Sequence, residues 1–536
     1  MSLMFRIASS TPILLTTLCL IAIIHRIFIS PLLLMHHYQN QGIKGSRFIP
    51  LVGDLPYISR MRSNHIPFNE WFKFWDESCG RVSFFFMGPD MRLRLGDPEL
   101  ARGVLITNAA SFNKTPLMRN TMGRLLGNGL LLSEGIEHRT HRALVSPAFT
   151  YNRMRAFAPV IHSAAKRGIS ALINAGKDGT IPVDFHAHAA GLTLWIIAVA
   201  AFGVELPGLL PATEGTTTSS TDSASFAVTD NDAKGVYDSI SFLLSSFVKA
   251  VSSLSAFLPV WIQRRMPTQF AIRIRNEITN LRLLVGKIIS TRRNVRESTS
   301  SANEEKGFLI DQLLDSGLSN ESILDESLTF VMAGHETTAQ ALSFALYLLA
   351  KHPEIRSALI NEIEKAIPLS NDFTPSTENY SCERMPLLNG VLYETLRLFP
   401  PAPLVARIAI TDVLLTSSSL PPSPPLHILK GTAVVIPIAS IHRDATLWPN
   451  PDDFLPERWA EGPTKNLLHP LAFLAFSAGT RNCVGSQFAL LEARIILAEL
   501  VRAADWKLDD TYIHAPEMAV TLRPALGMPI RVWGRK

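Results

Sequence analysis

The residues with the clearest chemistry lie between Phe476 and Gly485, a segment that reads Phe-Ser-Ala-Gly-Thr-Arg-Asn-Cys-Val-Gly just ahead of an apolar helical stretch. This order presents the thiol of Cys483 at a helix start, where unpaired N–H groups and partial positive charge favour a thiolate. Gly479 and Gly485 allow the backbone to turn tightly and to approach a flat ligand or the sulfur itself, and Phe476 is placed to shield the sulfur from water. Arg481 supplies a cation suited to a carboxylate. A lone cysteine is more often a buried small hydrophobe, but this ten-residue combination favours a ligating thiolate.

A second set of polar residues interrupts an otherwise apolar helix predicted over residues 323–349, whose centre reads Ala-Gly-His-Glu-Thr-Thr from Ala333 onward. Thr337 is placed to donate to the carbonyl of Ala333 one turn earlier, and Gly334 weakens the helix. A bend with room for water or dioxygen is therefore expected there, with Glu336 as a proton relay. The alternative is a buried threonine pair with Glu336 extending to solvent.

A third candidate group is the pair Glu394 and Arg397, which stand three residues apart on a helix predicted over residues 386–399 and so share one face. The helix is mainly apolar, so burial of the pair is expected. An exposed pair would contribute only about 0.3 kcal/mol, whereas buried charges must be paired because they have lost their water.

Taken together, these segments resemble the cytochrome P450 family, from about residue 42 to the C-terminus. The family's haem-binding signature, Phe-x-x-Gly-x-Arg-x-Cys-x-Gly, is matched at all of its fixed positions. The resemblance implies that Cys483 is the thiolate ligand of a haem that activates oxygen. It also implies that Glu394 and Arg397 form a structural network with Arg458, in the segment Pro-Glu-Arg-Trp, that holds the cysteine loop.

The polar centre of the apolar helix is similar to the family's distal-helix motif, Ala/Gly-Gly-x-Asp/Glu-Thr. The resemblance implies that Glu336 and Thr337 are the catalytic pair that delivers protons to oxygen, and that Ala333 and Gly334 border the haem. His335 then occupies the variable position of the motif.

Haem propionates need cations or hydrogen-bond donors, and the family resemblance implies three candidates besides Arg481. Arg407 follows a Pro-rich segment, where a strand is expected. Arg142 matches the Arg of the family's Trp-and-Arg pair, but His138 stands at the Trp position. A histidine still donates one N–H to a propionate, although a solvated surface histidine is the alternative.

Composition limits the class of protein. The 536 residues are 47% hydrophobic and 18% charged, with a formal net charge of +5, which is too diffuse for a nucleic-acid footprint. A basic docking face or an anionic membrane surface fits better. The cysteines show no CxxC pair and no regular spacing, so neither a structural zinc site nor a disulfide framework is expected, and a reducing compartment is the simpler assumption; they are Cys19, Cys79, Cys382 and Cys483.

An uncharged, mostly apolar run over residues 7–24 is close to the about 20 residues that cross a bilayer. A cleaved signal peptide is the competing interpretation, but another bulky run follows where a small-residue cleavage site would stand. We therefore expect residues 1–41 to form a single-pass anchor with its flank. Basic residues follow the span (Arg26, Lys44 and Arg47), which predicts a catalytic domain that faces the cytosol, in a membrane such as the endoplasmic reticulum.

The rest of the chain, residues 42–536, is expected to be one catalytic domain. Residues 212–234 are rich in Thr, Ser, Asp and Gly and predict a flexible surface insertion in it. Helical periodicity is strong and strands are short, so the fold class is mainly α with small β-sheets, the cytochrome P450 fold by resemblance. Helices are predicted at 192–202, 272–293, 323–349, 353–367 and 386–399, and strands at 82–86, 433–437 and 520–522.

The resemblance implies a haem-dependent monooxygenase that inserts one atom of O2 into a lipophilic small molecule, such as a lipid or secondary metabolite. Electrons are expected from a membrane-bound reductase that uses NADPH, because no Gly-x-Gly-x-x-Gly or flavin segment is visible in the chain. Two alternatives stay open: a haem-thiolate isomerase or dehydratase, and a haem protein that binds ligands without turnover. Apolar substrate walls are expected from the distal helix and from residues 112–131, 242–257, 403–406 and 512–518.

Overall fold

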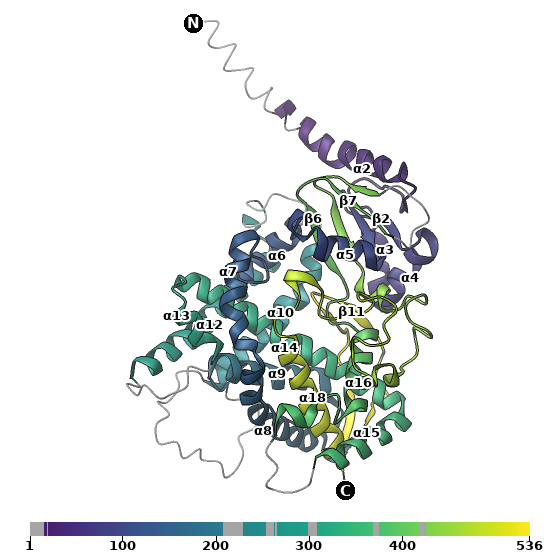
Figure 1. Cartoon of the computed structure of the whole chain (residues 1–536). Coiled ribbons are helices and arrows are strands. Elements are labelled where there is room, and N and C mark those ends of the chain that lie inside the picture. Colours follow the sequence, from purple (N-terminus) through teal and green to yellow (C-terminus); the bar gives the residue numbers. More distant parts are fainter. Residues whose placement is uncertain are drawn as a thin grey trace, which may run out of the picture.

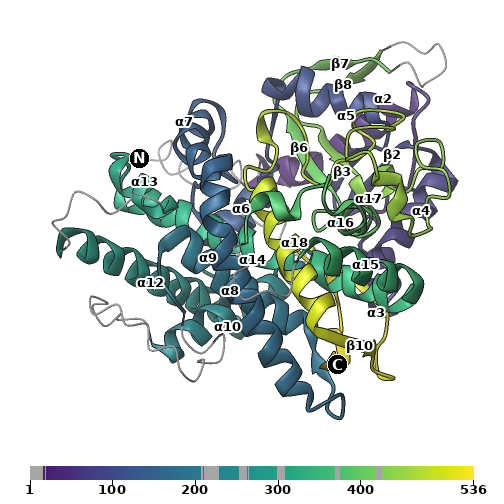
Figure 2. The ribbon, with the colours of Figure 1, turned by 60° about the horizontal axis from the view of Figure 1, so that its bottom comes forward.

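The computed structural model describes residues 16–18, 20–206, 209, 229–252, 262, 265–298, 308–367, 375–417 and 425–535. Long helices make up most of this part of the chain, and small sheets gather beside them (Figures 1 and 2). The predicted class, mainly α with small β-sheets, is confirmed.

The α-helices in the described residues are α2 (Ser30–Gln39), α3 (Leu55–Ser63), α4 (Phe68–Cys79), α5 (Pro98–Arg102), α6 (Pro116–Leu126), α7 (Gly135–Val145), α8 (Tyr151–Gly176), α9 (Phe185–Phe202), α10 (Asp230–Ser252), α12 (Gln269–Ser298), α13 (Leu309–Asp315), α14 (Asn320–Lys351), α15 (Pro353–Ala366), α16 (Pro386–Leu398), α17 (Ile438–Ile441) and α18 (Ser486–Ala503). The strands are β1 (Lys44–Gly45), β2 (Val82–Met87), β3 (Asp90–Leu95), β4 (Phe112–Asn113), β5 (Val183–Asp184), β6 (Val405–Ala409), β7 (Val413–Leu415), β8 (Leu426–Ile428), β9 (Ala433–Ile436), β10 (Ala504–Leu508), β11 (Pro516–Met518), β12 (Leu522–Pro524) and β13 (Pro529–Gly534).

The largest sheet among the described residues has the strand order β1-β2-β3-β9-β6-β4. Strands β2 and β3 form an antiparallel pair, β9 lies parallel to β3, and β6 returns antiparallel to β9 with Arg407 opposite Val434. This pairing fixes the strand that carries Arg407, as the sequence predicted. Smaller sheets have the orders β10-β13-β5, β11-β12 and β7-β8.

Helix α14 lies at the centre of the fold in both ribbon views, between α9 on one side and α16 and α18 on the other (Figures 1 and 2). It begins where the hydroxyl of Ser319 accepts a hydrogen bond from the backbone N–H of Ser322, which satisfies one open donor of the first turn. Its side chains are apolar on most faces, so burial on several sides is the favourable arrangement. Helix α14 contains the segment Ala-Gly-His-Glu-Thr-Thr, and α18 follows directly after the loop that contains Cys483.

The predicted helices are confirmed, but their ends differ from the predicted ones. In one case a capping residue explains where the helix begins. The helix predicted from residue 192 begins at Phe185, because the carboxylate of Asp184 accepts a hydrogen bond from His186 N at 3.0 Å. The strand predicted at 520–522 is largely wrong. Strand β12 begins at Leu522 and pairs antiparallel with β11, with Leu522 opposite Met518.

Part of the predicted surface insertion is also helical. Residues 212–228 lie outside the described residues, but helix α10 begins at Asp230, inside the predicted flexible segment. The hydroxyl of Thr229 accepts from Asp232 N at 3.2 Å, and Thr229 N donates to the Asp232 carboxylate at 2.9 Å. This reciprocal capping starts the helix, and composition alone did not reveal it.

The described N-terminal residues form a helical run, Thr16–Gln39, that is long and apolar enough to cross a membrane. Most of its side chains are exposed, unlike those of α9, which passes the same test of length and composition but lies in the core. Pro31 follows a π-helical turn, His25–Ile29, since proline has no N–H to donate to the preceding turn. The predicted span began at residue 7, and residues 7–15 lie outside the described residues.

Candidate active site

A cavity of about 610 Å³ lies between the distal face of α14 and the loop that contains Cys483. Its walls are mostly apolar, a composition typical of sites for small organic molecules. Ala333, Gly334 and Thr337 border it from α14, and Phe476 and Cys483 border it from the loop. The structure therefore brings together two motifs that lie about 150 residues apart in the chain.

The thiol of Cys483 is open to the cavity and otherwise enclosed by protein. Its loop is closed by a hydrogen bond from Cys483 N to the carbonyl of Phe476 at 2.9 Å. Burial raises the pKa of the Cys483 thiol, while the backbone N–H of Gly485 and the charge of Arg142 lower it. The N–H of Gly485 thus favours the thiolate, as the sequence predicted for the helix start, but burial has the larger effect and the net direction is upward. A bound metal cation is the additional charge that deprotonates a coordinating thiol.

The glycines of the loop have different roles. Gly479 has a φ of 74°, and a Cβ there would lie 2.1 Å from the carbonyl oxygen of Leu105, so only glycine fits. Gly485 has a φ of −90°, and the nearest atom to a Cβ would be a ring carbon of Phe149 at 3.6 Å. The tight turn is therefore confirmed at Gly479. Gly485 makes no tight turn, but its N–H lies beside the sulfur, which agrees with the expected approach of the backbone to the sulfur.

Arg142 of α7 contacts the cysteine loop directly. Its guanidinium donates to the backbone carbonyl of Asn482 at 2.6 Å and to the side-chain oxygen of the same residue at 2.8 Å. His138, one turn earlier, is buried and borders the cavity. Burial and the charges of Arg481 and Lys114 lower the pKa of His138 to about 4, so its ring is neutral at pH 7 and keeps one N–H to donate.

A buried cluster of cations borders the cavity beside this histidine: Lys114, Arg407 and Arg481. Arg481 pairs with Glu134 and donates to the carbonyl of Ser133 at 2.9 Å. Burial and mutual repulsion hold the pKa of Lys114 well below its usual range and lower the pKa of Arg407 to about 10. Sequence reasoning missed Lys114, because nothing in its local sequence shows that three distant cations meet there.

The cluster and the thiol fit a haem. Buried positive charge is costly unless an anion accompanies it, and Glu134 alone faces Lys114, Arg407 and Arg481 in the part of the chain that the structure describes. Two propionates would supply that anionic partner. A thiol on the adjacent wall of an apolar cavity supplies one soft ligand, as a haem-thiolate centre requires.

The distal motif lies against the same cavity. Thr337 Oγ1 donates to the carbonyl of Ala333 at 2.9 Å, as predicted. Glu336 is buried, so the alternative in which it extends to solvent is wrong. Helix α14 continues without interruption through Gly334, where a Cβ would lie 2.9 Å from Ile197 of α9. Close packing of α9 against α14 therefore explains this glycine.

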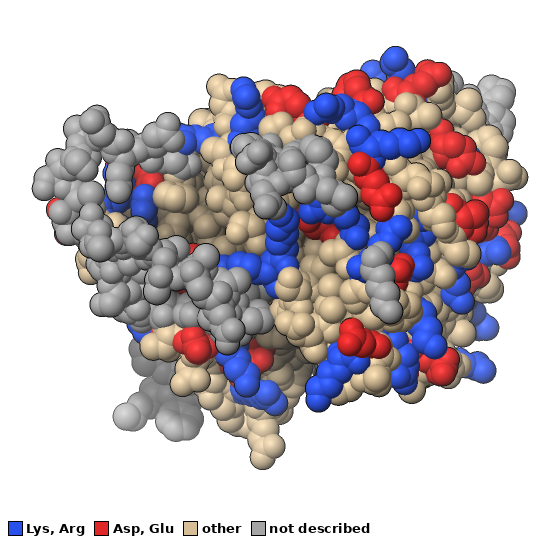
Figure 3. All heavy atoms as spheres, turned by 90° about the horizontal axis from the view of Figure 1, so that it is seen from below, with Lys and Arg blue, Asp and Glu red and all other residues tan. Residues whose placement is uncertain are grey.

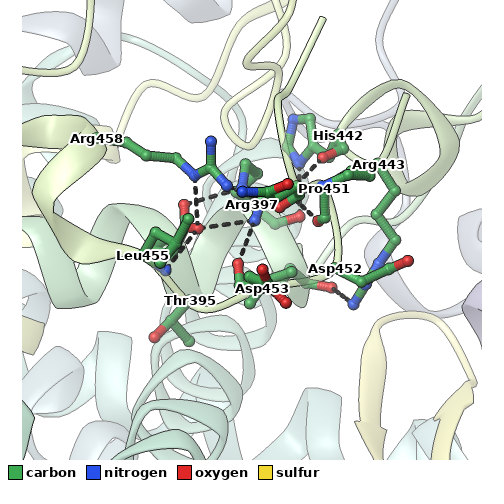
Figure 4. Close-up of polar contacts among 12 residues, drawn as sticks. Thr395, Arg397, His442, Arg443, Pro451, Asp452, Asp453, Leu455 and Arg458 are labelled. Atoms are coloured by element: carbon green, nitrogen blue, oxygen red, sulfur yellow. Dashed lines mark hydrogen bonds and ion pairs between the residues drawn. The ribbon is translucent and has the colours of Figure 1, made fainter. Parts of the chain in front are cut away.

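Glu394 and Arg397 are fully buried on α16 and form a bidentate ion pair, with N–O distances of 2.8 and 2.7 Å. Arg458 joins them through a 3.2 Å bond from its Nε to Glu394, which confirms the expected contacts of this network (Figure 4). Trp459 also donates to Glu394, at 2.9 Å. Arg397 donates to three backbone carbonyl oxygens, those of His442, Pro451 and Asp453, at 2.8, 2.6 and 3.0 Å.

His442 connects this network to the segment before Cys483. Burial and the charge of Arg397 lower the pKa of His442 to about 3, so the ring is neutral. Its Nδ1–H then donates to the carbonyl of Arg397 at 3.0 Å, and its Nε2 accepts from Leu474 N at 2.7 Å. The sequence offered no signal for this link, because a single histidine in a loop has no distinctive pattern.

Two further features were missed, one in the cavity wall and one beside it. Phe68, Trp71, Phe72 and Trp75 line it from α4 at helical spacing, a periodicity that could have been recognised as an inward face. Glu492 of α18 is fully buried next to Thr338, and burial raises the pKa of its carboxyl to about 8.

The expected substrate walls are found in large part. Residues from 112–131, 403–406 and the distal helix line the cavity, whereas Met518 is the contribution of 512–518. From 242–257, the part whose side chains are described contributes Leu244 and Phe247, and residues 253–257 lie outside the described residues.

A thiol facing an apolar cavity beneath a long central helix is the arrangement of a haem-thiolate oxygenase, and comparison with known proteins agrees. The family model "Cytochrome P450" matches residues 43–529, so the chain belongs to the cytochrome P450 family. Members of this family bind haem through a cysteine thiolate, and the chain is accordingly a monooxygenase of the oxidoreductase class.

Similar proteins include a cytokinin hydroxylase of Arabidopsis thaliana, 28% identical over 519 residues, which cover 92% of this chain and 91% of the relative. Cytochrome P450 709B1 of the same plant is 28% identical over 527 residues, 93% of each chain. Cytochrome P450 72A552 of Barbarea vulgaris is 25% identical over 523 residues, which cover 94% of this chain and 93% of the relative.

Proposed function

We propose that this monooxygenase holds its haem through the sulfur of Cys483, with the propionates at the cations of the cluster described above. Arg407, Arg481, Arg142 and Lys114 would bind the propionates, and neutral His138 would donate one N–H. The observation that carries this assignment is the thiol of Cys483 on one wall of the apolar cavity, opposite the distal helix. When bound, the haem supplies the binding and reductive activation of dioxygen.

The residues of α14 then control protons and water. Thr337 presents its hydroxyl at the cavity wall and donates its O–H to the carbonyl of Ala333, so its oxygen can accept a hydrogen bond from a donor in the cavity. Glu336 is the adjacent acid, and burial raises the pKa of its carboxyl. Ala333 and Gly334 are small, so this part of the helix surface would allow the haem to approach closely. Apolar walls exclude bulk water from the rest of the cavity.

The substrate is a lipophilic small molecule, because aromatic and aliphatic side chains dominate the cavity walls. The hydroxylase named above acts, as its name says, on a cytokinin, and a hydroxylated product is the corresponding outcome proposed here. A lipid or secondary metabolite fits the same walls. The proposed domain is residues 42–536, and residues 1–41 carry the anchor and its flank.

Electrons are proposed to come from an NADPH-dependent flavoprotein reductase in the same membrane. The helix Thr16–Gln39 would anchor the chain in the endoplasmic reticulum, with the catalytic domain on the cytosolic side. Figure 3 shows Lys and Arg interspersed with Asp and Glu on one face of the molecule. Such a mixed surface suits a transient protein partner better than nucleic acid.

The first test is the absorption spectrum of the reduced, carbon-monoxide-bound protein, which reports a thiolate ligand. Cys483→Ser should abolish the thiolate-type band, whereas Cys382→Ser, at a free cysteine away from the cavity lining, should keep it. A thiolate-type band in Cys483→Ser would refute the ligand assignment. NADPH consumption with product formation from a panel of lipophilic ligands, in the presence of a reductase, then tests turnover.

A further inference from the structure

A second polar network lies on the face of α14 that carries Glu336. Glu336, Gln340 and Ser343 recur at positions i, i+4 and i+7, so they share one face of an otherwise apolar helix. All three side chains are buried. Buried polar groups on such a helix need partners. The hydroxyl of Ser343 donates to the carbonyl of Ala339 within α14 at 2.7 Å, whereas Gln340 finds its partner outside the helix.

Thr521, immediately before β12, is the partner of the first two. Gln340 Nε2 donates to Thr521 Oγ1 at 2.7 Å, and Thr521 in turn hydrogen-bonds the carboxyl of Glu336. A hydroxyl has one proton, and a carboxylate only accepts. The order of donors is therefore fixed when Glu336 is ionised: the Gln340 amide donates to the Thr521 hydroxyl, which donates to Glu336.

Charged and titratable groups surround Glu336 from three other elements. Arg523 of β12 lies close enough to favour the ionised carboxyl. The charges of Asp184 and Glu336 raise the pKa of Tyr237 of α10. The charge of Asp184 raises the pKa of His186 of α9, and the charge of Arg523 lowers it. His186 also contacts α14 directly, with its Nδ1 3.2 Å from the hydroxyl of Ser343.

Two opposing effects therefore act on Glu336. Burial raises the pKa of its carboxyl and is the largest effect, while the hydrogen bond from Thr521 and the charge of Arg523 lower it. A carboxyl that must both take up and release a proton near neutral pH needs this kind of balance.

We propose that Thr521 and Gln340 are positioning residues for Glu336, which hold its carboxyl at the cavity wall and keep it ready to exchange protons. The inference rests on the proposed function, in which Glu336 delivers protons during oxygen activation. It adds to that function two residues from segments 180 residues apart that are joined by the 2.7 Å hydrogen bond. It also gives the C-terminal segment before β12 a part in proton delivery.

The test is an infrared titration of the Glu336 carboxyl in the haem-loaded, full-length protein. The band is identified by subtraction of the spectrum of Glu336→Gln. Thr521→Val removes the donor at nearly constant volume, and the titration midpoint should move upward by about one pH unit, the effect expected from loss of one hydrogen bond to a charged group. Gln340→Leu should move it in the same direction, and Thr521→Ser should restore the wild-type midpoint.

Thr395→Val is the matched control, because Thr395 is also fully buried, but its hydroxyl bonds only within α16, to the carbonyl of Val391 at 2.7 Å. This variant should titrate like the wild type. A wild-type midpoint in both Thr521→Val and Gln340→Leu would overturn the proposal, as would equal shifts in Thr521→Val and Thr395→Val.

The yield of peroxide per NADPH, measured in parallel, separates this proposal from the proposed function. Thr521→Val should raise the peroxide yield several-fold, in the same direction as Glu336→Gln. If Thr521→Val shifts the infrared midpoint but Glu336→Gln leaves the peroxide yield unchanged, positioning of Glu336 is supported and its proposed role in proton delivery is refuted.

Discussion

Lys114 offers a prediction in which the haem-free and haem-bound proteins respond in opposite directions. The side chain is buried next to Arg407 and Arg481, and burial and repulsion both hold its pKa well below the usual range. Methionine has nearly the same length and no charge. Lys114→Met should therefore stabilise the haem-free protein, by about 1 to 3 kcal/mol, the range found when buried ionic groups are replaced by apolar ones.

The same substitution should weaken haem binding in the haem-bound protein. If Lys114 donates to a propionate, the variant lacks one charge-assisted hydrogen bond, about 1.5 to 3 kcal/mol. That loss corresponds to haem dissociation about ten to a hundred times faster. Thermal unfolding of the haem-free chain and transfer of haem to a scavenging globin measure the two effects separately.

The pH dependence of stability gives an independent check that the charge of Lys114 destabilises the haem-free protein. The unfolded chain holds the Lys114 proton up to a pKa of about 10.4, whereas the folded haem-free chain releases it at lower pH. Stability of the haem-free protein should therefore rise with pH between the folded and unfolded pKa values, and Lys114→Met should flatten this rise.

The matched control is Arg119→Met, which removes an exposed cation from the neighbouring helix α6 and should change neither measurement. Equal haem loss from both variants, or a haem-free Lys114→Met protein less stable than the wild type, would refute the interpretation of the cluster as a propionate site.

Three further predictions concern the supporting structure. Arg397→Lys keeps the charge but loses the bidentate pair, and should lower the free energy of unfolding by about 2 to 4 kcal/mol in chemical denaturation, whereas Arg273→Lys, in an exposed pair, should cost less than about 0.5 kcal/mol. Because folding raises the pKa of Glu492 to about 8, wild-type stability should fall between about pH 4.5 and pH 8; Glu492→Gln should remove this slope and be more stable than the wild type by about 5 kcal/mol above pH 8, and an unchanged slope would contradict the assignment. Gly479→Ala should destabilise the haem-free protein by about 2 kcal/mol or more through backbone strain and a clash, whereas Gly485→Ala should not, as thermal unfolding would show.

The parts of the site that the sequence predicted correctly are those whose chemistry is local. Thr337 and Ala333 are one helical turn apart, and Glu394 and Arg397 share a helix face, so spacing alone predicts their contacts. The apolar pattern around them also located the long central helix. The loop of Cys483 was recognised because several residue types recur at fixed positions.

Contacts between distant segments could not be predicted in this way. Glu134 meets Arg481 across 347 positions of the chain, and His442 meets Leu474 only after the whole fold has formed. The net direction of the pKa shift of the Cys483 thiol could not be predicted for a related reason. Local N–H groups were visible in the sequence, but the larger effect comes from enclosure by side chains of many elements.

The raised pKa of the Cys483 thiol has a consequence for the life of the protein before it acquires its cofactor. Oxidants and electrophiles attack the sulfur anion far more readily than the neutral S–H form. Before haem binds, the raised pKa therefore favours the less reactive S–H form of this residue. The burial that makes the sulfur a weaker acid also makes it a poorer target for such reagents.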